Sequence, residues 1–359
     1  MSSLLEQRYR TVLRLLPADY RQAWGDDMVA SFMQAAYAAA PEDPEGVEIS
    51  RPSFAEAASI AALALRLRLG GSGAAPRPFS WGEAVRRVAL IGLLAQAAGA
   101  LSGVILLTWA LKQLPGAMPL PDATPAFGGN RWLALWSFTV LLWLPAYLSA
   151  VHGHHRAARL LAAVAFLPVL VGGVLTMTDA AQGGVTATRV AWLVLPAVPL
   201  LALAAFGPDA PRMRTRPWLI ALPVGTVVLV AVGLAAQPWP GREQLVLALA
   251  DWPGLWSAGV TAAAVACLSV GRRDRLPVWP LALALLVPPV LALRVITVLD
   301  YVRMGAYTHD TAVAVTIGVI QSVVLVTVGA VLAGTAAHRL RRLPAPTDTA
   351  HHHTAATTG

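Results

Sequence analysis

From about residue 88 to the C-terminal end, the chain alternates between long apolar stretches and short polar segments. Eight stretches are long enough, or nearly so, to cross about 30 Å of hydrocarbon as a helix that rises about 1.5 Å per residue. We therefore predict an all-α fold, a polytopic membrane helix bundle of about eight transmembrane helices. The predicted spans are residues 88–110, 132–151, 160–178, 190–206, 218–236, 254–270, 278–299 and 312–336.

The first 70 residues show a different pattern, with apolar positions at helical spacing between many charges. Residues 4–16 predict a helix that Pro17 ends, and a second helix runs to about Ala40. An acidic stretch, residues 41–52, predicts a loop, and the capping box of Ser53 with Glu56 opens a third helix. We expect a small cytoplasmic three-helix domain at residues 1–70, a linker at 71–83, a transmembrane domain at 84–337 and a disordered cytoplasmic tail at 338–359.

One face of the second predicted helix carries four large apolar residues at i, i+4 spacing, namely Tyr20, Trp24, Met28 and Phe32. Two interpretations remain open: they form the core of the small domain, or they form a candidate partner-binding face. The end of the third helix, residues 65–69, alternates Leu and Arg, a pattern that could lie along the anionic inner leaflet.

Composition supports the membrane class, because 57% of the residues are hydrophobic and only 13% are charged. The net charge of +8 raises the question of a nucleic-acid partner. Residues 1–80, however, hold eight Arg and nine acids, so the positive excess lies in the short loops of the apolar part. We therefore expect the lipid bilayer as a partner and no nucleic acid.

The loop arginines predict the orientation of the spans. With a cytoplasmic N-terminus, the inner segments that flank the eight spans carry sixteen Lys or Arg and the outer ones carry five. This asymmetry satisfies the positive-inside rule and puts both termini in the cytoplasm of a cell membrane. Trp132, Trp192 and Trp252 are also spaced 60 residues apart, which indicates either a tandem repeat of hairpins or spans and loops that happen to be equal in length.

The N-terminal residues resemble a known domain. The segments that carry the resemblance are residues 8–10 (Arg-Tyr-Arg), 15–21 (Leu-Leu-Pro-Ala-Asp-Tyr-Arg), 26–28 (Asp-Asp-Met), 51–53 (Arg-Pro-Ser) and 65–70 (Leu-Arg-Leu-Arg-Leu-Gly). They look like the helical permease-prefix domain of actinobacterial membrane proteins, which is similar to the HAAS-type signalling domain. The resemblance implies a permease-like protein or one paired with a PadR-type transcription regulator. The longest predicted outer loop, residues 112–131, is too short for a permease with a large extracytoplasmic domain.

No motif predicts a reaction. The chain has no phosphate-loop motif, no H-E-x-x-H and no G-x-S-x-G, and Cys267 is its only cysteine. The run His152-Gly-His154-His155 has no acid or cysteine beside it, which favours a solvated basic loop over a metal site. We therefore expect no enzyme activity, no cofactor and no metal.

Arg294 is the strongest candidate for an intramembrane polar site, because it is the only strong charge within an otherwise apolar span. With Asp300 or Asp251 it would form either a packing ion pair or part of an outward-facing polar site, and it could also snorkel towards the outer surface.

We expect a non-enzymatic signalling, regulatory or partner-binding membrane protein that meets a cytoplasmic regulator or a transporter subunit through residues 1–70. The alternative is a transporter or permease component acting with other subunits.

Overall fold

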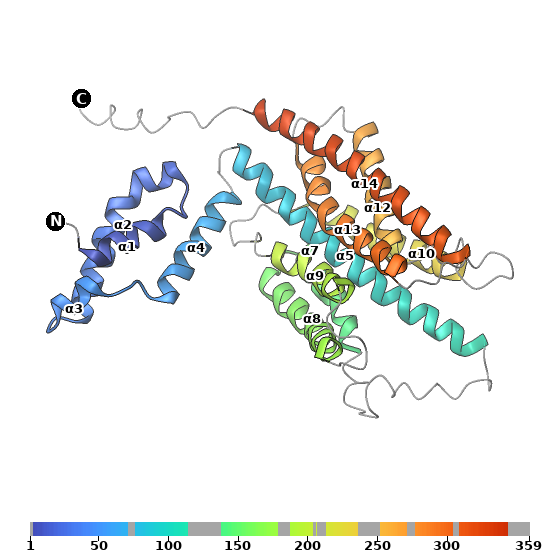
Figure 1. Cartoon of the computed structure of the whole chain (residues 1–359), viewed down its shortest axis with the longest axis horizontal. Helices are drawn as coiled ribbons and strands as arrows, with labels where there is room; N and C mark the ends of the chain where they lie inside the picture. The colour runs from blue at the N-terminus through green and yellow to red at the C-terminus, as the bar shows by residue number, and fades with distance from the viewer. Residues whose placement is uncertain are drawn as a thin grey trace. The chain divides into compact units, whose positions relative to one another are not determined.

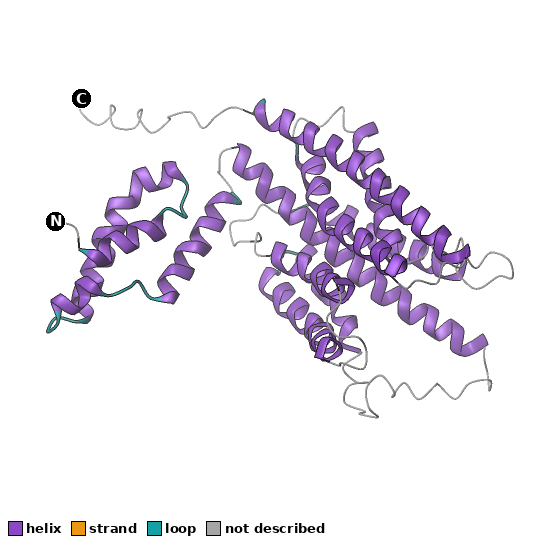
Figure 2. Cartoon of the chain, in the orientation of Figure 1, coloured by secondary structure: helices purple, strands orange, loops and turns teal. Residues whose placement is uncertain are grey.

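The computed structural model describes residues 3–70, 76–113, 138–178, 187–203, 206, 213–235, 252–270, 277–303 and 309–343. Throughout this part of the chain the regular secondary structure is helical, as Figure 2 shows, which confirms the all-α prediction. The helices form two compact units. Unit 1 takes its described residues from positions below 83, and unit 2 comprises Glu83–Pro344.

Unit 1 contains four helices: α1 (Leu4–Leu13), α2 (Ala18–Ala39), α3 (Pro44–Ile49) and α4 (Phe54–Arg68). Three of them coincide with predicted helices, but α3 lies in the stretch that we predicted as a loop. Asp43 caps α3 by accepting a hydrogen bond from the Gly46 amide at 2.9 Å, and Pro44 occupies its first turn, where its missing N–H costs nothing. Unit 1 is therefore a four-helix unit, and the three-helix prediction was wrong by this short helix.

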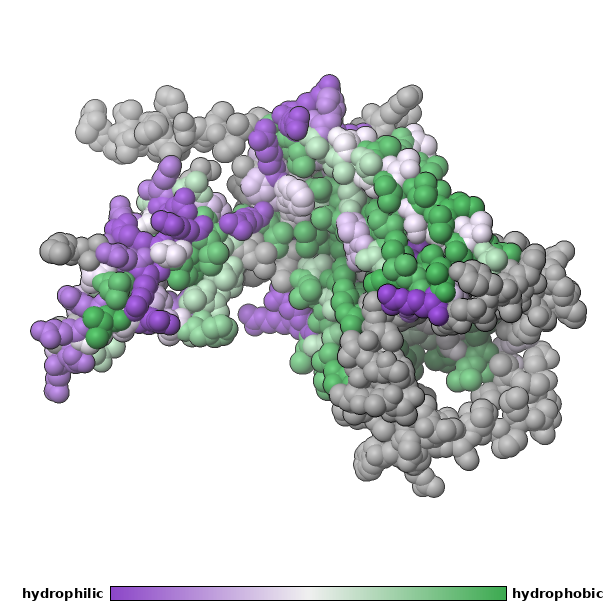
Figure 3. Space-filling model, in the orientation of Figure 1, coloured by the Kyte–Doolittle hydropathy of each residue, from purple (hydrophilic) through white to green (hydrophobic). Residues whose placement is uncertain are grey.

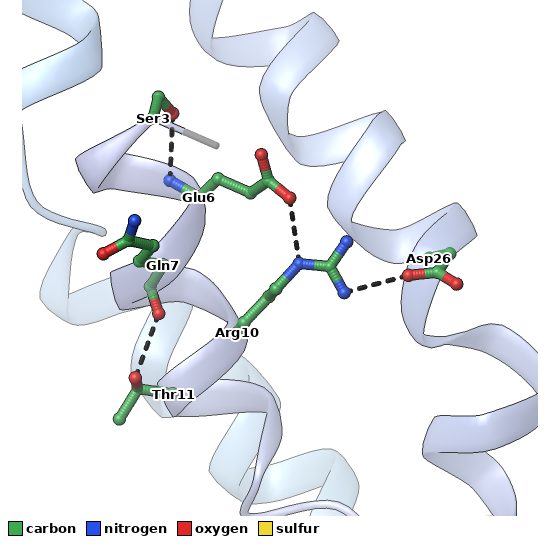
Figure 4. Close-up of polar contacts among 6 residues, drawn as sticks. All are labelled: Ser3, Glu6, Gln7, Arg10, Thr11 and Asp26. Atoms are coloured by element: carbon green, nitrogen blue, oxygen red, sulfur yellow. Dashed lines mark hydrogen bonds and ion pairs between the residues drawn. The ribbon is translucent and has the colours of Figure 1, made fainter. Parts of the chain in front are cut away.

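Unit 1 has a core of its own. Its buried apolar side chains come from α1, α2, α4 and the turn after α1, and the Tyr9 ring stacks on Phe32 with 3.9 Å between ring centroids. Exposed arginine side chains connect the helices of unit 1 through hydrogen bonds and ion pairs. Arg8 donates to the Ile49 carbonyl at 2.7 Å, and Arg68 donates to the Leu15 carbonyl at 2.8 Å. In Figure 4 the Arg10 side chain lies between Glu6 of α1 and Asp26 of α2, 2.9 Å from each carboxylate.

At the end of α4, Leu63 and Leu67 pack against the core of unit 1, and Arg68 donates a hydrogen bond to the Leu15 carbonyl at 2.8 Å. The placement of residues 65–69 along the inner leaflet stays a prediction.

Every predicted span overlaps a helix of the structure, as Figure 1 shows. In chain order these are α5 (Pro76–Gln113), the 3₁₀ helix η2 (Phe138–Leu142) with α7 (Trp143–Val151), α8 (His155–Thr178), α9 (Ala187–Ala202), α10 (Thr215–Ala235), α12 (Trp252–Val270), α13 (Val278–Arg303) and α14 (His309–Arg341).

Five described helices are long and apolar enough to cross a membrane: α5, α8, α10, α13 and α14. The chain is thus a multi-pass membrane protein by the length and composition of its helices. The described apolar parts of α7, α9 and α12 are shorter, so the count of eight spans stays a prediction. Figure 3 shows the corresponding surface: unit 2 is mostly hydrophobic on the face in view, whereas unit 1 is rich in hydrophilic side chains.

The predicted boundaries shift at both ends of unit 2. Because α5 begins at Pro76, residues 76–83 of the predicted linker are helical. Because α14 continues to Arg341, the first residues of the predicted tail are helical as well. The tail from residue 344 onwards lies outside the described residues.

Close approaches at glycines give the directions of two helix pairs. A Cβ at Gly225 would lie 3.6 Å from Ala98, and one at Gly233 would lie 2.5 Å from Leu106 Cδ1, so α10 and α5 run parallel. In the other pair, Gly329 of α14 meets Val287 of α13 and Gly318 meets Arg294, so α13 and α14 are antiparallel. Both directions agree with alternating crossings, because these helices are the first, fifth, seventh and eighth predicted spans.

Candidate functional site

Arg294 is buried inside unit 2 on the face of α13 that meets α14. Its exposed fraction is 1%, and its neighbours Val290 and Leu293 are equally buried. The guanidinium lies beside Gly318 of α14, where a Cβ would be in ordinary van der Waals contact with it, 3.4 Å from Arg294 Nε and 3.5 Å from Cζ. A snorkelling side chain would be exposed at the surface of the bundle. The burial of Arg294 instead favours a role between helices, where it makes at least one polar or electrostatic interaction.

The helix register places Gln321 at the level of Arg294. Val290 of α13 and Leu325 of α14 share one buried cluster, against which Trp256 of α12 packs. Arg294 is one turn beyond Val290, and Gln321 is one turn before Leu325 on the antiparallel helix. Gln321 Oε1 is buried and accepts no hydrogen bond from the residues that the structure describes. A polar spot thus lies within the α12–α14 part of the bundle.

Of the two acids predicted to accompany Arg294, Asp300 lies within the described residues and forms an ion pair with Arg303, one turn further along α13, at 4.0 Å. Asp251 lies outside the described residues. The pairing of Arg294 with Asp300 or Asp251 stays a prediction.

A second cluster, which we did not predict, lies near the start of α5. The Glu83 carboxylate forms a buried ion pair with Arg86 at 3.1 Å and a second ion pair with Arg87 at 3.5 Å. The Arg87 guanidinium also lies over the ring of Trp279, 4.4 Å from its centroid. The i, i+3 and i, i+4 spacing of Glu83 to these arginines was a signal for the ion pairs, but the cation–π contact to α13 depends on tertiary packing.

Trp218 connects this cluster to α10 and α7. Its ring stacks on Trp279 with 6.3 Å between centroids, and its carbonyl accepts a hydrogen bond from the buried Tyr147 hydroxyl at 2.6 Å. These contacts hold the N-terminal parts of α5, α10 and α13 and the middle of α7 next to one another.

The predicted basic loop is partly confirmed. His152 and His154 are exposed, but His155 is half-buried and lies 4.7 Å from the Phe206 ring, and Arg159 donates to the Phe206 carbonyl. No group of three His, Cys, Asp or Glu side chains suited to a metal occurs among the described residues.

An apolar cavity of about 970 Å³ lies within unit 2, between α5, α10, α12 and α13. Small side chains explain the space, because Ala98, Gly225, Gly259 and Ala263 face it from three helices. A Cβ at Gly259 would meet no atom within 4 Å. Trp218 and Trp279 lie at one end with Arg339 of α14, the single charged residue among the described residues of the lining. This cavity could not be predicted from the sequence, since small residues in spans are also typical of close helix packing.

The predicted partner-binding face of α2 divides into two parts. Tyr20, Met28 and Phe32 pack against the core of unit 1, as expected if these residues form the core of the small domain. Trp24, in contrast, is 55% exposed.

Comparison with protein-family models, curated proteins and solved structures finds no match for this chain. The resemblance of residues 1–70 to a permease-prefix domain therefore stays a prediction.

Proposed function

We propose that this chain is a non-enzymatic multi-pass membrane protein that binds a cytoplasmic protein through its N-terminal unit. The observation that carries the proposal is the exposed indole of Trp24 on a unit whose core is already closed by other side chains. Tryptophan is enriched among the residues that dominate binding energy in protein interfaces. The other three members of the predicted face are needed for folding, so Trp24 is the member left for a partner.

The charges around Trp24 indicate the chemistry of the partner. Asp26 has a side chain that is 89% exposed, and the Arg10 ion pair orients it, as Figure 4 shows. Asp27 is exposed beside it. A surface with an apolar pocket for the indole and basic residues at its rim would complement this arrangement. The resemblance of residues 1–70 implies a PadR-type regulator or a transporter subunit as the partner.

A photo-crosslinking amino acid placed at position 24 in living cells tests the proposal. Position 54 is the matched control, because Phe54 is an aromatic residue of the same unit and is 89% exposed. We expect a crosslinked protein at position 24 that is absent at position 54, and its loss when Asp27→Lys is added to the position-24 variant. The same products at both positions, or a set of co-purified partners unchanged by deletion of residues 1–70, would contradict the proposal.

The buried polar spot favours a second candidate, a transporter or permease component. Arg294 and Gln321 lie at one level of the bundle, and α9 and α13 each contain two prolines, which break the backbone hydrogen-bond ladder. The identity of the protein crosslinked at position 24 separates the candidates: a transcription regulator supports the first, and an ATPase subunit supports the second.

A further inference from the structure

The apolar cavity of unit 2 is long as well as large. On α10 it is lined from Trp218 to Val232, which are 14 residues apart. This separation corresponds to about 21 Å along a helix. One leaflet of a bilayer contributes about 15 Å of hydrocarbon, half of a core that is about 30 Å thick. The volume of about 970 Å³ is in the range of sites that hold a whole small molecule. An extended hydrocarbon chain therefore fits the length of the cavity.

The walls alone would not select a ligand. They are formed by apolar side chains between Leu255 and Cys267 of α12 and by the facing surfaces of α5, α10 and α13. Within a bilayer, lipid tails are already in an apolar surrounding, so moving a tail into the cavity yields little hydrophobic free energy. Selectivity must come from the one end of the cavity that carries charge.

That end is basic and aromatic. Arg339 lines it together with Trp218 and Trp279, and Arg87 lies over the Trp279 ring. Indole rings prefer the headgroup level of a membrane, which matches their position at one end of an apolar cavity. Glu83 is the acid at this end among the described residues, and it is shared between Arg86 and Arg87. Among the described residues, three arginines stand against one carboxylate at this end.

We propose that the cavity binds one anionic membrane lipid, with its hydrocarbon along α12 and its phosphate at Arg339 and the Arg87–Trp279 pair. Guanidinium groups bind phosphate through paired charge-assisted hydrogen bonds. A zwitterionic lipid offers the same tails without the net negative charge, and free phosphate offers the charge without the tails. This site is independent of the partner proposed for unit 1.

Cys267 provides a built-in reporter, because it is the only cysteine of the chain and it lines the cavity. The full chain is reconstituted into vesicles of phosphatidylcholine, or of phosphatidylcholine mixed with phosphatidylglycerol. The rate at which N-ethylmaleimide, an uncharged and membrane-permeant reagent, alkylates Cys267 is followed by the mass of the intact protein. We expect phosphatidylglycerol to slow the alkylation and phosphatidylcholine alone to leave it fast.

Two substitutions on α14 test the headgroup site. For Arg339→Gln we expect protection to require about fivefold more phosphatidylglycerol, the factor that corresponds to about 1 kcal/mol per arginine near a membrane surface. Arg341→Gln removes the same charge two residues further on, from a position that does not line the cavity, and should behave as the wild type. Equal protection by both lipids, or an Arg339→Gln protein that matches the Arg341→Gln protein, overturns the proposal.

Mass spectrometry of the purified complex provides a second measurement. Gly259→Leu places a side chain in open space within the cavity, so the protein should fold but lose the phosphatidylglycerol that the wild type retains. Retention of this lipid by a folded Gly259→Leu protein overturns the proposal. If inorganic phosphate protected Cys267 in vesicles of phosphatidylcholine alone, the site would bind free phosphate without a lipid tail, and the proposal would be overturned as well.

Discussion

The guanidinium of Arg294 lies beside Gly318, where a Cβ would be in van der Waals contact with it, 3.4 Å from Nε. This contact between α13 and α14 keeps a charge buried in an apolar bundle, with 1% of the side chain exposed. The two helices can meet this closely because position 318 has no side chain, since a Cβ there would clash with Val298.

Gly318→Ala should therefore destabilise unit 2. The added methyl group meets Val298 and Arg294 in a packed interface, and overpacking of this kind costs about 1–3 kcal/mol. Gly334→Ala is the matched control on the same helix, because a Cβ there meets no atom within 4 Å and alanine has the better helix propensity. Thermal unfolding of both proteins in one detergent measures the difference. Equal midpoints would mean that α13 and α14 do not pack as described.

Arg294→Leu should also lower the stability of the bundle, by about 1–3 kcal/mol, because the group that interacts with the buried guanidinium loses its partner. Arg303→Leu is the control, since its side chain is 71% exposed and a surface change of this kind costs within about 0.5 kcal/mol. Denaturant or thermal unfolding of the full chain compares them. Two variants with wild-type stability would favour a purely functional role for Arg294.

The stability of unit 1 should fall at alkaline pH. Burial raises the pKa of the Tyr9 phenol above its ordinary value of 10.0, and the Glu56 carboxylate raises it further. As the pH rises, the unfolded chain loses this proton first, so the stability that is present below pH 10.0 is lost as the pH approaches the higher folded pKa. Tyrosinate absorbance of the wild type minus that of Tyr9→Phe should show an ionisation above pH 10.0. A difference curve centred at pH 10.0 while the helices are still folded would contradict the raised pKa of Tyr9.

The apolar helices could be predicted from the sequence because hydrocarbon thickness dictates the length of a span, and each of the eight stretches overlaps a helix, of which five are long and apolar enough to cross a membrane. The short helix α3 was missed although its signal was present. Asp43 followed by Pro44 is a capping residue with a proline at the first helical position, and the acidic composition around them favoured a loop instead.

The face of α2 was predicted only in part. The i, i+4 spacing places the four residues near one face of the helix, but it does not say which of them meet the other helices of unit 1. Tyr20, Met28 and Phe32 pack against the core, whereas Trp24, which lies between Tyr20 and Met28 on this face, is exposed. The lipid cavity and the Arg87–Trp279 contact depend on which helices meet, and spacing along one helix carries no such information.

Cysteine accessibility in intact cells tests whether the chain crosses the membrane eight times with both termini in the cytoplasm. In a Cys267→Ser background, single cysteines replace Arg214 and Asp274 in predicted inner loops and Arg242 in a predicted outer loop. A membrane-impermeant maleimide should label position 242 in intact cells, and positions 214 and 274 only after the membrane is opened. Labelling of position 214 or 274 from outside the cell would contradict the topology, and with it the cytoplasmic location of the unit that we propose binds the partner.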